Sequence, residues 1–158
     1  MGVQIEDHQE EMRKAIKLLL SKNIYVGITS RTSAREGPIS NAAIGYIHEN
    51  GSPVNNIPAR PHLRPGLESV RKEITKRLRG MAQLALRGKG ERIPQEQNNL
   101  GLFAAGAVQN YISDSSHFVP LAPGTVATRV RRGRQPPFAP LIDTSAYRRA
   151  MTYVIRSK

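Results

Sequence analysis

The chain contains no cysteine among its 158 residues. Disulfide bonds, thiol catalysis and cysteine-ligated zinc are therefore excluded, and the sequence fits assembly in a reducing cytoplasm. Tryptophan is also absent, and aromatic residues make up only 5% of the chain. A chain of this length can still bury a core without covalent or metal cross-links. We expect a single domain, 1–158, with a modest core and irregular arms around it.

Long apolar runs are missing as well. The longest, LGLFAAGAV at residues 100–108, is far shorter than the roughly 20 residues that span a bilayer. The N-terminus MGVQIEDHQE lacks the basic and apolar regions of a signal peptide. We therefore expect a chain that does not associate with membranes.

Acidic residues are scarce, with 12 Asp and Glu against 24 Lys and Arg, a formal net charge of +12. The imbalance is uneven, because residues 55–92 hold ten basic and three acidic side chains and residues 129–158 hold eight and one. Two strongly basic segments predict an anionic partner surface, either nucleic acid or an acidic protein ring.

Residue patterns that carry catalysis are not found. The four histidines form no metal-ligand spacing, and the pair His48-Glu49 is followed by Asn50-Gly51-Ser52, so the zinc-protease pattern H-E-x-x-H fails. Asp143 is the only acid in the last 44 residues, whereas a two-metal nuclease needs clustered carboxylates. We predict that the chain is not an enzyme and has no catalytic, metal or cofactor site.

Hydrophobic periodicity predicts an α+β fold. Apolar residues at three- and four-residue spacing indicate helices at Ile5–Leu20, Leu67–Leu86 and Gln95–Ile112. The runs IYVGIT (24–29) and MTYVIR (151–156) are typical of strands. We expect the two strands to pair in a small antiparallel or mixed sheet packed against a long central helix, Leu67–Leu86.

Two segments are predicted to be extended arms. Residues 30–38 are polar and include Gly37-Pro38, and residues 129–140 are rich in arginine and end in prolines. Both lack apolar periodicity, so we expect them to order only in an assembly. The second arm could neutralise phosphates, but it has no interleaved aromatic residues for base stacking.

A proline-rich basic stretch precedes the helix at 67–86. This strap, HENGSPVNNIPARPHLRPGL at residues 48–67, contains four prolines. Each proline fixes φ and lowers the entropy of the extended chain, so the strap can lie against a neighbour without a large ordering cost. The alternative is an ordinary rigid connector that packs on its own domain.

Two motifs carry a resemblance to a known family. The stretch 47–51 (IHENG), followed by 57–65 (IPARPHLRP), resembles a signature of bacteriophage tail-completion proteins, the minor tail or neck components of long-tailed double-stranded-DNA phages. The stretch 140–154 resembles the closing motif of the same family, P-L-x-D-T-G followed by a short helix and a strand. Asn50 stands where an aromatic residue is usual, His62 where Phe is usual, and Ser145 where Gly is usual.

The resemblance implies a structural virion protein at the head–tail junction, assembled in the bacterial host cytoplasm. Its subunits would form a homo-oligomeric ring, with a hexamer favoured, and would join the DNA-filled head to the tail. The implied partners are other copies of the chain, adjoining head-completion or connector proteins, tail-tube or tail-terminator proteins, and phage DNA in the channel.

The basic residues are expected to serve this ring. Dense arginines in a channel would bind phosphates and retard DNA, so we expect most of them to contact acidic surfaces of neighbouring subunits. The predicted subunit or ring interface residues are Arg60, His62, Arg64, Arg131, Arg132 and Arg134. Arg31 and Arg35 are the predicted DNA-channel contacts. The alternative function is non-specific nucleic-acid binding through the basic arms.

Overall fold

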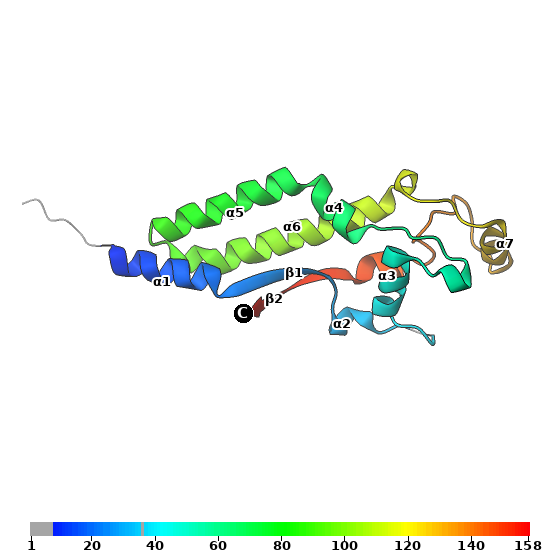
Figure 1. Cartoon of the computed structure of the whole chain (residues 1–158), viewed down its shortest axis with the longest axis horizontal. Coiled ribbons are helices and arrows are strands. Elements are labelled where there is room, and N and C mark those ends of the chain that lie inside the picture. Colours follow the sequence, from blue (N-terminus) through cyan, green and yellow to red (C-terminus); the bar gives the residue numbers. More distant parts are fainter. Residues whose placement is uncertain (1–7, 36) are drawn as a thin grey trace, which may run out of the picture.

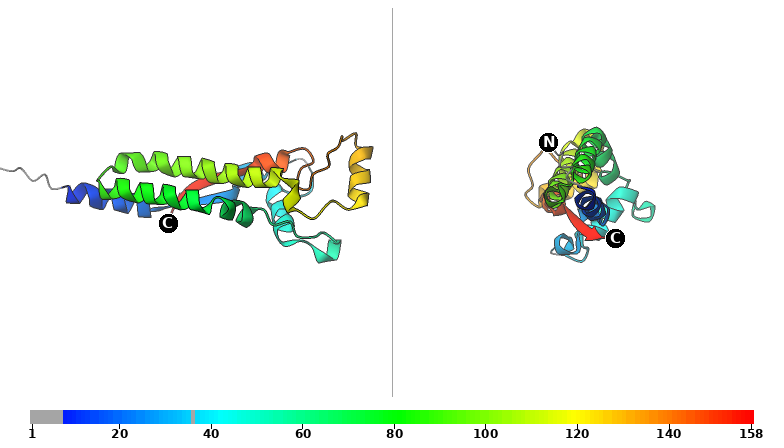
Figure 2. Two further views of the ribbon diagram at one scale, coloured as in Figure 1. Left: turned by 90° about the horizontal axis from the view of Figure 1, so that it is seen from above. Right: turned by 90° about the vertical axis from the view of Figure 1, so that its left-hand side faces the viewer.

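The computed structural model describes residues 8–35 and 37–158 and has the predicted α+β fold. Its α-helices are α1 (Gln9–Leu20), α2 (Ser30–Ser33), α3 (Asn41–Asn50), α4 (Leu63–Ser69), α5 (Arg71–Leu86), α6 (Ile93–Ser113), α7 (Pro123–Arg131) and α8 (Ala146–Ala150). The strands are β1 (Lys22–Ile28) and β2 (Met151–Ser157), and short 3-10 turns lie at Pro53–Asn55, Gly90–Arg92 and Ser115–His117. The molecule is elongated: α5 and α6 run along it, α1 lies at one end and α7 at the other (Figures 1 and 2).

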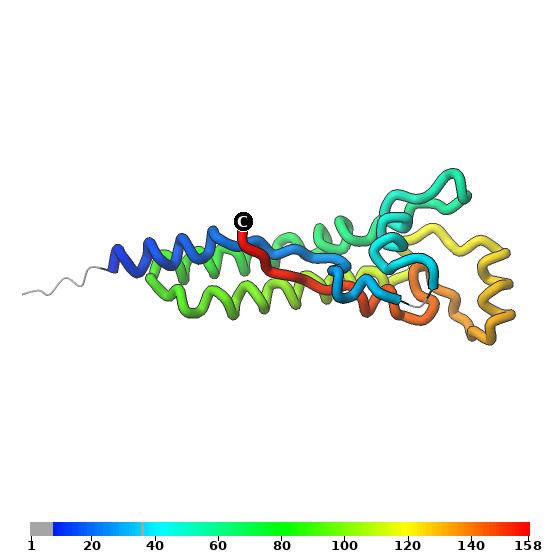
Figure 3. Tube along the Cα trace, turned by 90° about the horizontal axis from the view of Figure 1, so that it is seen from below, coloured from blue at the N-terminus to red at the C-terminus, as the bar shows by residue number. Residues whose placement is uncertain are grey.

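The two predicted strands form one antiparallel sheet. They come from opposite ends of the sequence and lie side by side along the molecule (Figure 3). A two-stranded sheet is marginal by itself and needs an apolar face to pack on. Val26 and Ile28 of β1 and Met151 of β2 supply that face, and they join the core cluster around Val108 and Ile112 of α6.

The helix that supports the sheet is α6, so the prediction that Leu67–Leu86 is the central helix is wrong. That stretch forms two helices, because the chain leaves helical geometry at Val70 (φ −114°, ψ 15°). α5 packs on α1 and α6, and only Met81 and Ala85 of its apolar stripe are fully buried. Leu78 of the same stripe is 47% exposed.

Small residues let other elements approach α6 closely at two places along its length. Gly101 lies directly beneath the ring of Tyr153 in β2, where a Cβ atom would overlap the ring. About two turns farther along α6, a Cβ on Gly66 of α4 would lie 3.1 Å from the Cα of Val108. The position of the sheet and that of α4 therefore both depend on glycines.

Both predicted arms contain helix, which corrects their assignment as loops. Residues 30–33 form the short α2, stabilised by a reciprocal capping box between Thr29 and Thr32. The arginine-rich segment begins inside α7, whose first residue, Pro123, suits an N-terminal position because its missing N–H would be unpaired there. Their ordering on assembly stays a prediction. Residues 5–7 of the predicted first helix lie outside the described residues.

Candidate functional site

The strap folds back on its own subunit. Ser52 and Ile57 form an isolated antiparallel bridge, so residues 52–57 make a tight loop at the end of α3. Gly51 (φ 76°) allows this turn, since a Cβ there would lie 2.9 Å from the backbone nitrogen of Ala59. The tip carries Val54, which is 97% exposed. The strap is thus a loop anchored to its own subunit. For residues 51–62, a rigid connector packed on its own domain is a better description than a segment that lies against a neighbouring subunit.

Arg60 holds the strap to the segment after α6. Its Nε donates to the carbonyl of Val119 at 2.8 Å and its Nη2 donates to the carbonyl of Pro120 at 2.9 Å. The side chain is only 6% exposed, and burial, with a smaller effect of Arg129, lowers the pKa of Arg60. The expectation that Arg60 binds carboxylates of a neighbouring subunit is corrected, because its guanidinium is committed to two carbonyls of its own chain.

Glu49 caps α4. Its Oε2 accepts hydrogen bonds from the backbone N–H groups of His62 and Leu63, at 3.0 and 3.2 Å. A carboxylate at this place satisfies N–H groups that have no partner within the helix. The glutamate of the motif therefore fixes where the strap ends and α4 begins.

His62 links the two sequence motifs. Its Nδ1 lies 2.9 Å from the carbonyl oxygen of Arg60, which can only accept, so Nδ1 carries the proton of this bond. Its Nε2 lies 2.7 Å from the hydroxyl of Tyr147, and the two atoms share a buried hydrogen bond. His62 is 1% exposed, and burial, aided by Glu49, raises the pKa of Tyr147. His62 is therefore a core residue, which corrects its assignment to a subunit interface.

The buried network formed by Glu49, His62 and Tyr147 brings the tail-completion-like motifs into contact. The first motif supplies Glu49 and His62, and the closing motif supplies Tyr147, 85 positions away from His62. Edge-to-ring contacts of Tyr147 with both His48 and His62 complete the packing. The two motifs therefore make one structural unit.

Ser145 occupies the position at which the tail-completion motif carries glycine. Its φ is 59°, in the left-handed region that glycine enters without strain. It precedes α8 and its side chain makes no capping hydrogen bond. The backbone at this position favours glycine, and the serine is strained there.

Replacing Ser145 by glycine is expected to raise the free energy of unfolding by about 0.5–1 kcal/mol, because strain at a positive φ is relieved. The measurement is urea unfolding followed by circular dichroism. A matched control is Ala146→Gly, one position later inside α8, which is expected to destabilise by about 1 kcal/mol. Equal destabilisation by the two changes would contradict the assigned backbone conformation.

His48 is a partly buried histidine whose charge the fold opposes. Burial lowers the pKa of His48 from its ordinary 6.5 to about 4, and the charges of His62 and Arg60 act in the same direction. Its Nδ1 is buried without a hydrogen-bond partner. A proton on His48 is thus bound more tightly by the unfolded chain than by the native one.

Stability is therefore expected to fall as pH is lowered from 6.5 to 4. His48 contributes fully to stability above pH 6.5, and about 3 kcal/mol of that contribution is lost once pH passes below the native pKa. Urea unfolding between pH 7.5 and about 4 measures the loss. His48→Leu should flatten the dependence over this range. A variant that keeps the slope of the parent would exclude His48 as its source.

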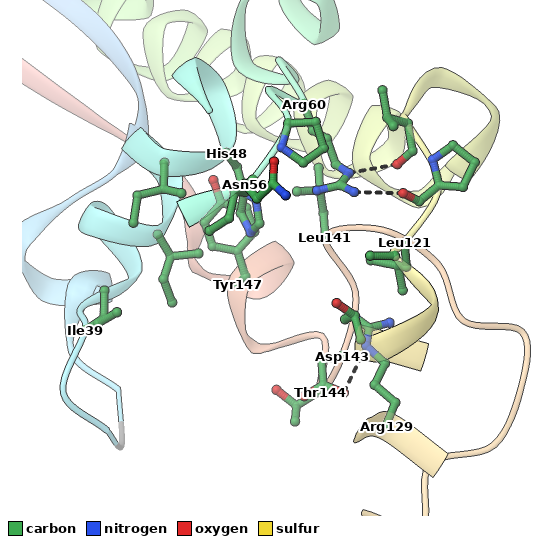
Figure 4. A pocket seen from close by; sticks show the side chains of 18 of the residues that line it. Ile39, His48, Asn56, Arg60, Leu121, Arg129, Leu141, Asp143, Thr144 and Tyr147 are labelled. Atoms are coloured by element: carbon green, nitrogen blue, oxygen red, sulfur yellow. Dashed lines mark hydrogen bonds and ion pairs between the residues drawn. The ribbon is translucent and has the colours of Figure 1, made fainter. Parts of the chain in front are cut away.

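A pocket of about 580 Å³ opens beside this network, between the strap, α8 and the segment leading into α7 (Figure 4). Its walls are largely apolar and include Ile39, Ile57 and Leu121. One wall of the pocket is charged and contains the ion pair of Arg129 and Asp143, whose Nε and Oδ1 atoms lie 3.7 Å apart. Arg129 also donates to the carbonyl oxygens of Ala139 and Ile142 at 2.9 and 2.8 Å, and so ties the second arm to the domain.

The remaining predicted site residues do not form one cluster. Arg134 pairs with Asp143 at 3.4 Å within the subunit, whereas Arg131 and Arg132 are exposed on and after α7. Arg64 is exposed on α4, and Arg31 is exposed on α2. Arg35 is exposed and lines the pocket. The sequence interpretation missed the structural roles of Glu49 and Tyr147, for which only their places inside the two motifs could have been a signal.

The hydrogen bonds of Arg60, Glu49 and Tyr147 hold the strap to the rest of the subunit. Within residues 8–35 and 37–158, no group of three or more metal-binding side chains is placed to hold an ion. In the same part of the chain, no helix has both the length and the apolar character needed to cross a membrane. Comparisons of the chain with protein-family models, with curated proteins and with solved structures gave no match.

Proposed function

We propose that this chain is a structural protein of a long-tailed phage virion that forms a ring at the head–tail junction. The ring, with a hexamer favoured, joins the DNA-filled head to the tail and leaves a channel for DNA. The observation that carries the proposal is the contact between the two tail-completion-like motifs through His62 and Tyr147. Motifs that pack as one unit are stronger support than two separate matches along a sequence.

Exposed apolar side chains support a contact surface at the α7 end of the molecule. Val54 at the tip of the strap loop is 97% exposed, Val130 of α7 is 55% exposed, and Ile39 and Val119 at the pocket are 45% and 53% exposed. Other exposed apolar side chains, such as Leu86 of α5 and Leu102 of α6, lie elsewhere on the molecule. The four at the α7 end form one such group, and exposed apolar groups are typical of surfaces that bind other proteins. The adjoining ring components, or a second copy of the chain, are the partners that the proposal assigns to this end.

A nonsense mutation in the gene of this chain tests the proposal in the phage that encodes it. We expect electron micrographs of the lysate to show DNA-filled heads and separate complete tails, since the joint between them would be missing. Supplying the chain from a plasmid should restore tailed particles. Normal tailed particles without the chain would contradict the proposal and favour the alternative, a nucleic-acid-binding protein outside the virion.

A further inference from the structure

The surface of α5 that faces away from α1 and α6 carries a row of cations. Lys72, Lys76 and Arg79 are all exposed, and at 100° per residue they lie within about 60° of one another. We call these three residues the basic stripe. α5 runs along one long side of the molecule (Figure 1), and its 16 residues make a straight rod of roughly 24 Å.

The basic stripe is not neutralised by the described part of the chain. The two nearby acids are used by other arginines: Glu68 pairs with Arg71 at 3.6 Å and Glu73 with Arg77 at 3.0 Å. Arg77 also stacks over the ring of Phe103, 4.4 Å from its centroid, and so belongs to the contact between α5 and α6. Within residues 8–35 and 37–158, none of the three stripe cations has a carboxylate partner.

The composition of the stripe favours phosphates over a protein partner. Like charges three and four residues apart destabilise a helix by a few tenths of a kcal/mol per pair, which an anion on this face would relieve. Protein interfaces are depleted of lysine, and their strong contacts come from buried aromatic and arginine anchors. The stripe offers two lysines and no aromatic residue. The three side chains are separated by about 6 and 4.5 Å along the helix axis. This is the same order as the spacing of duplex phosphates, which lie about 3.4 Å apart per strand along the axis.

We propose that the basic stripe contacts the phosphate backbone of double-stranded DNA without reading its sequence. The inference rests on the proposed function in one respect, since it assigns this stripe to the DNA that passes through the ring. Three dispersed cations per subunit give a weak and salt-sensitive interaction. Such an interaction centres the duplex in a channel without holding it.

The test is the salt dependence of binding between the purified full-length chain and a short mixed-sequence DNA duplex, measured by fluorescence anisotropy. In the triple variant K72Q/K76Q/R79Q, the slope of log K against log salt should become shallower by about 3 units, about 0.9 for each phosphate contact removed. The matched control, R13Q/K17Q/R156Q, removes the same charge from exposed cations on α1 and β2 and should change the slope by less than about 1 unit.

Three outcomes would overturn the inference. An equal loss of slope in both triple variants would show that net charge alone matters, and an unchanged slope in the stripe variant would remove the stripe from DNA binding. An unchanged slope together with loss of tailed particles in the phage would assign the stripe to a protein partner. The proposed function is judged separately by the nonsense mutant, so a virion protein without a DNA-binding stripe is a distinguishable result.

Discussion

Replacing Tyr147 by alanine is expected to lower the free energy of unfolding by about 3–5 kcal/mol, the range for large core aromatic residues. The ring is 5% exposed and packs within the core cluster that contains Val108, Leu141 and Met151. The change also leaves His62 Nε2 buried without its hydroxyl partner, which adds to the loss. Because both tail-completion-like motifs meet at this residue, the strap should lose its anchor as well.

The control for this prediction is Tyr147→Phe, which keeps the ring and removes only the hydroxyl. We expect a loss of about 1–3 kcal/mol, set by the unsatisfied imidazole nitrogen. Replacing His62 by Phe in that background gives the aromatic residue usual in the family and removes the orphan nitrogen, so part of the loss should return. Urea unfolding measures all three variants. An alanine variant as stable as the parent would mean that Tyr147 is not a core residue.

Replacing Gly101 by alanine is expected to destabilise the protein by at least about 2 kcal/mol, as overpacking of a filled contact does. A Cβ at this position overlaps the Tyr153 ring close to its attachment to β2. Rotation of the ring is opposed by the hydrogen bond from its hydroxyl to Asn98 Oδ1 at 3.0 Å. The strand must therefore move away from α6.

The same helix provides a control of opposite sign. Gly106 is also in α6, and a Cβ there meets nothing within 4 Å. Gly106→Ala should therefore stabilise the protein by about 0.5–1 kcal/mol through helix propensity. The midpoints of thermal unfolding of the two variants should move in opposite directions. If both alanine variants stabilise the protein, then β2 does not pack on Gly101.

Local periodicity was sufficient to predict most of the fold. The strands at 24–29 and 151–156 and the helix at 95–112 were each signalled by their own residues, and all three are confirmed within a few residues. The identity of the central helix was not predictable in this way. The apolar stripe of α5 is more regular in the sequence than that of α6. The sheet nevertheless packs on α6, because Gly101 lets β2 approach that helix closely. Local periodicity does not report such a tertiary contact.

The contacts of the arginines were also not predictable from the sequence, because they too are set by tertiary structure. Arg60 and Arg134 lie in basic segments and looked like surface charges, yet each is used within the subunit. The partners of Arg60 are the carbonyls of Val119 and Pro120, which are distant in the sequence. The partner of Arg134 is the carboxylate of Asp143, and no sequence pattern indicates this pair. The exposed charge of α5 and the pairing of Glu73 with Arg77 were visible in the sequence. Only the structure shows that Glu68 pairs with Arg71 and not with Lys72.

Because Arg60 and Arg134 are used within the subunit, other residues are expected to make the contacts between neighbouring subunits. Arg60 is bound within its own subunit, so in the proposed ring we assign a contact at this end to the apolar tip of the loop and to the exposed Arg131 and Arg132 of the second arm. Arg131 and Arg132 remain proposed contacts to acidic neighbours. The basic stripe lies along the flank of the molecule, on a different element, and so leaves that end free for protein contacts.

The central claim, a single ring of this chain at the head–tail junction, is tested most directly by counting its copies in purified virions with quantitative mass spectrometry. A closed ring predicts a small fixed number of copies per particle, about six for the favoured hexamer. The same count should hold in particles from independent preparations. Absence of the chain from purified virions, or a copy number in the hundreds as for a capsid or tail-tube subunit, would contradict the claim.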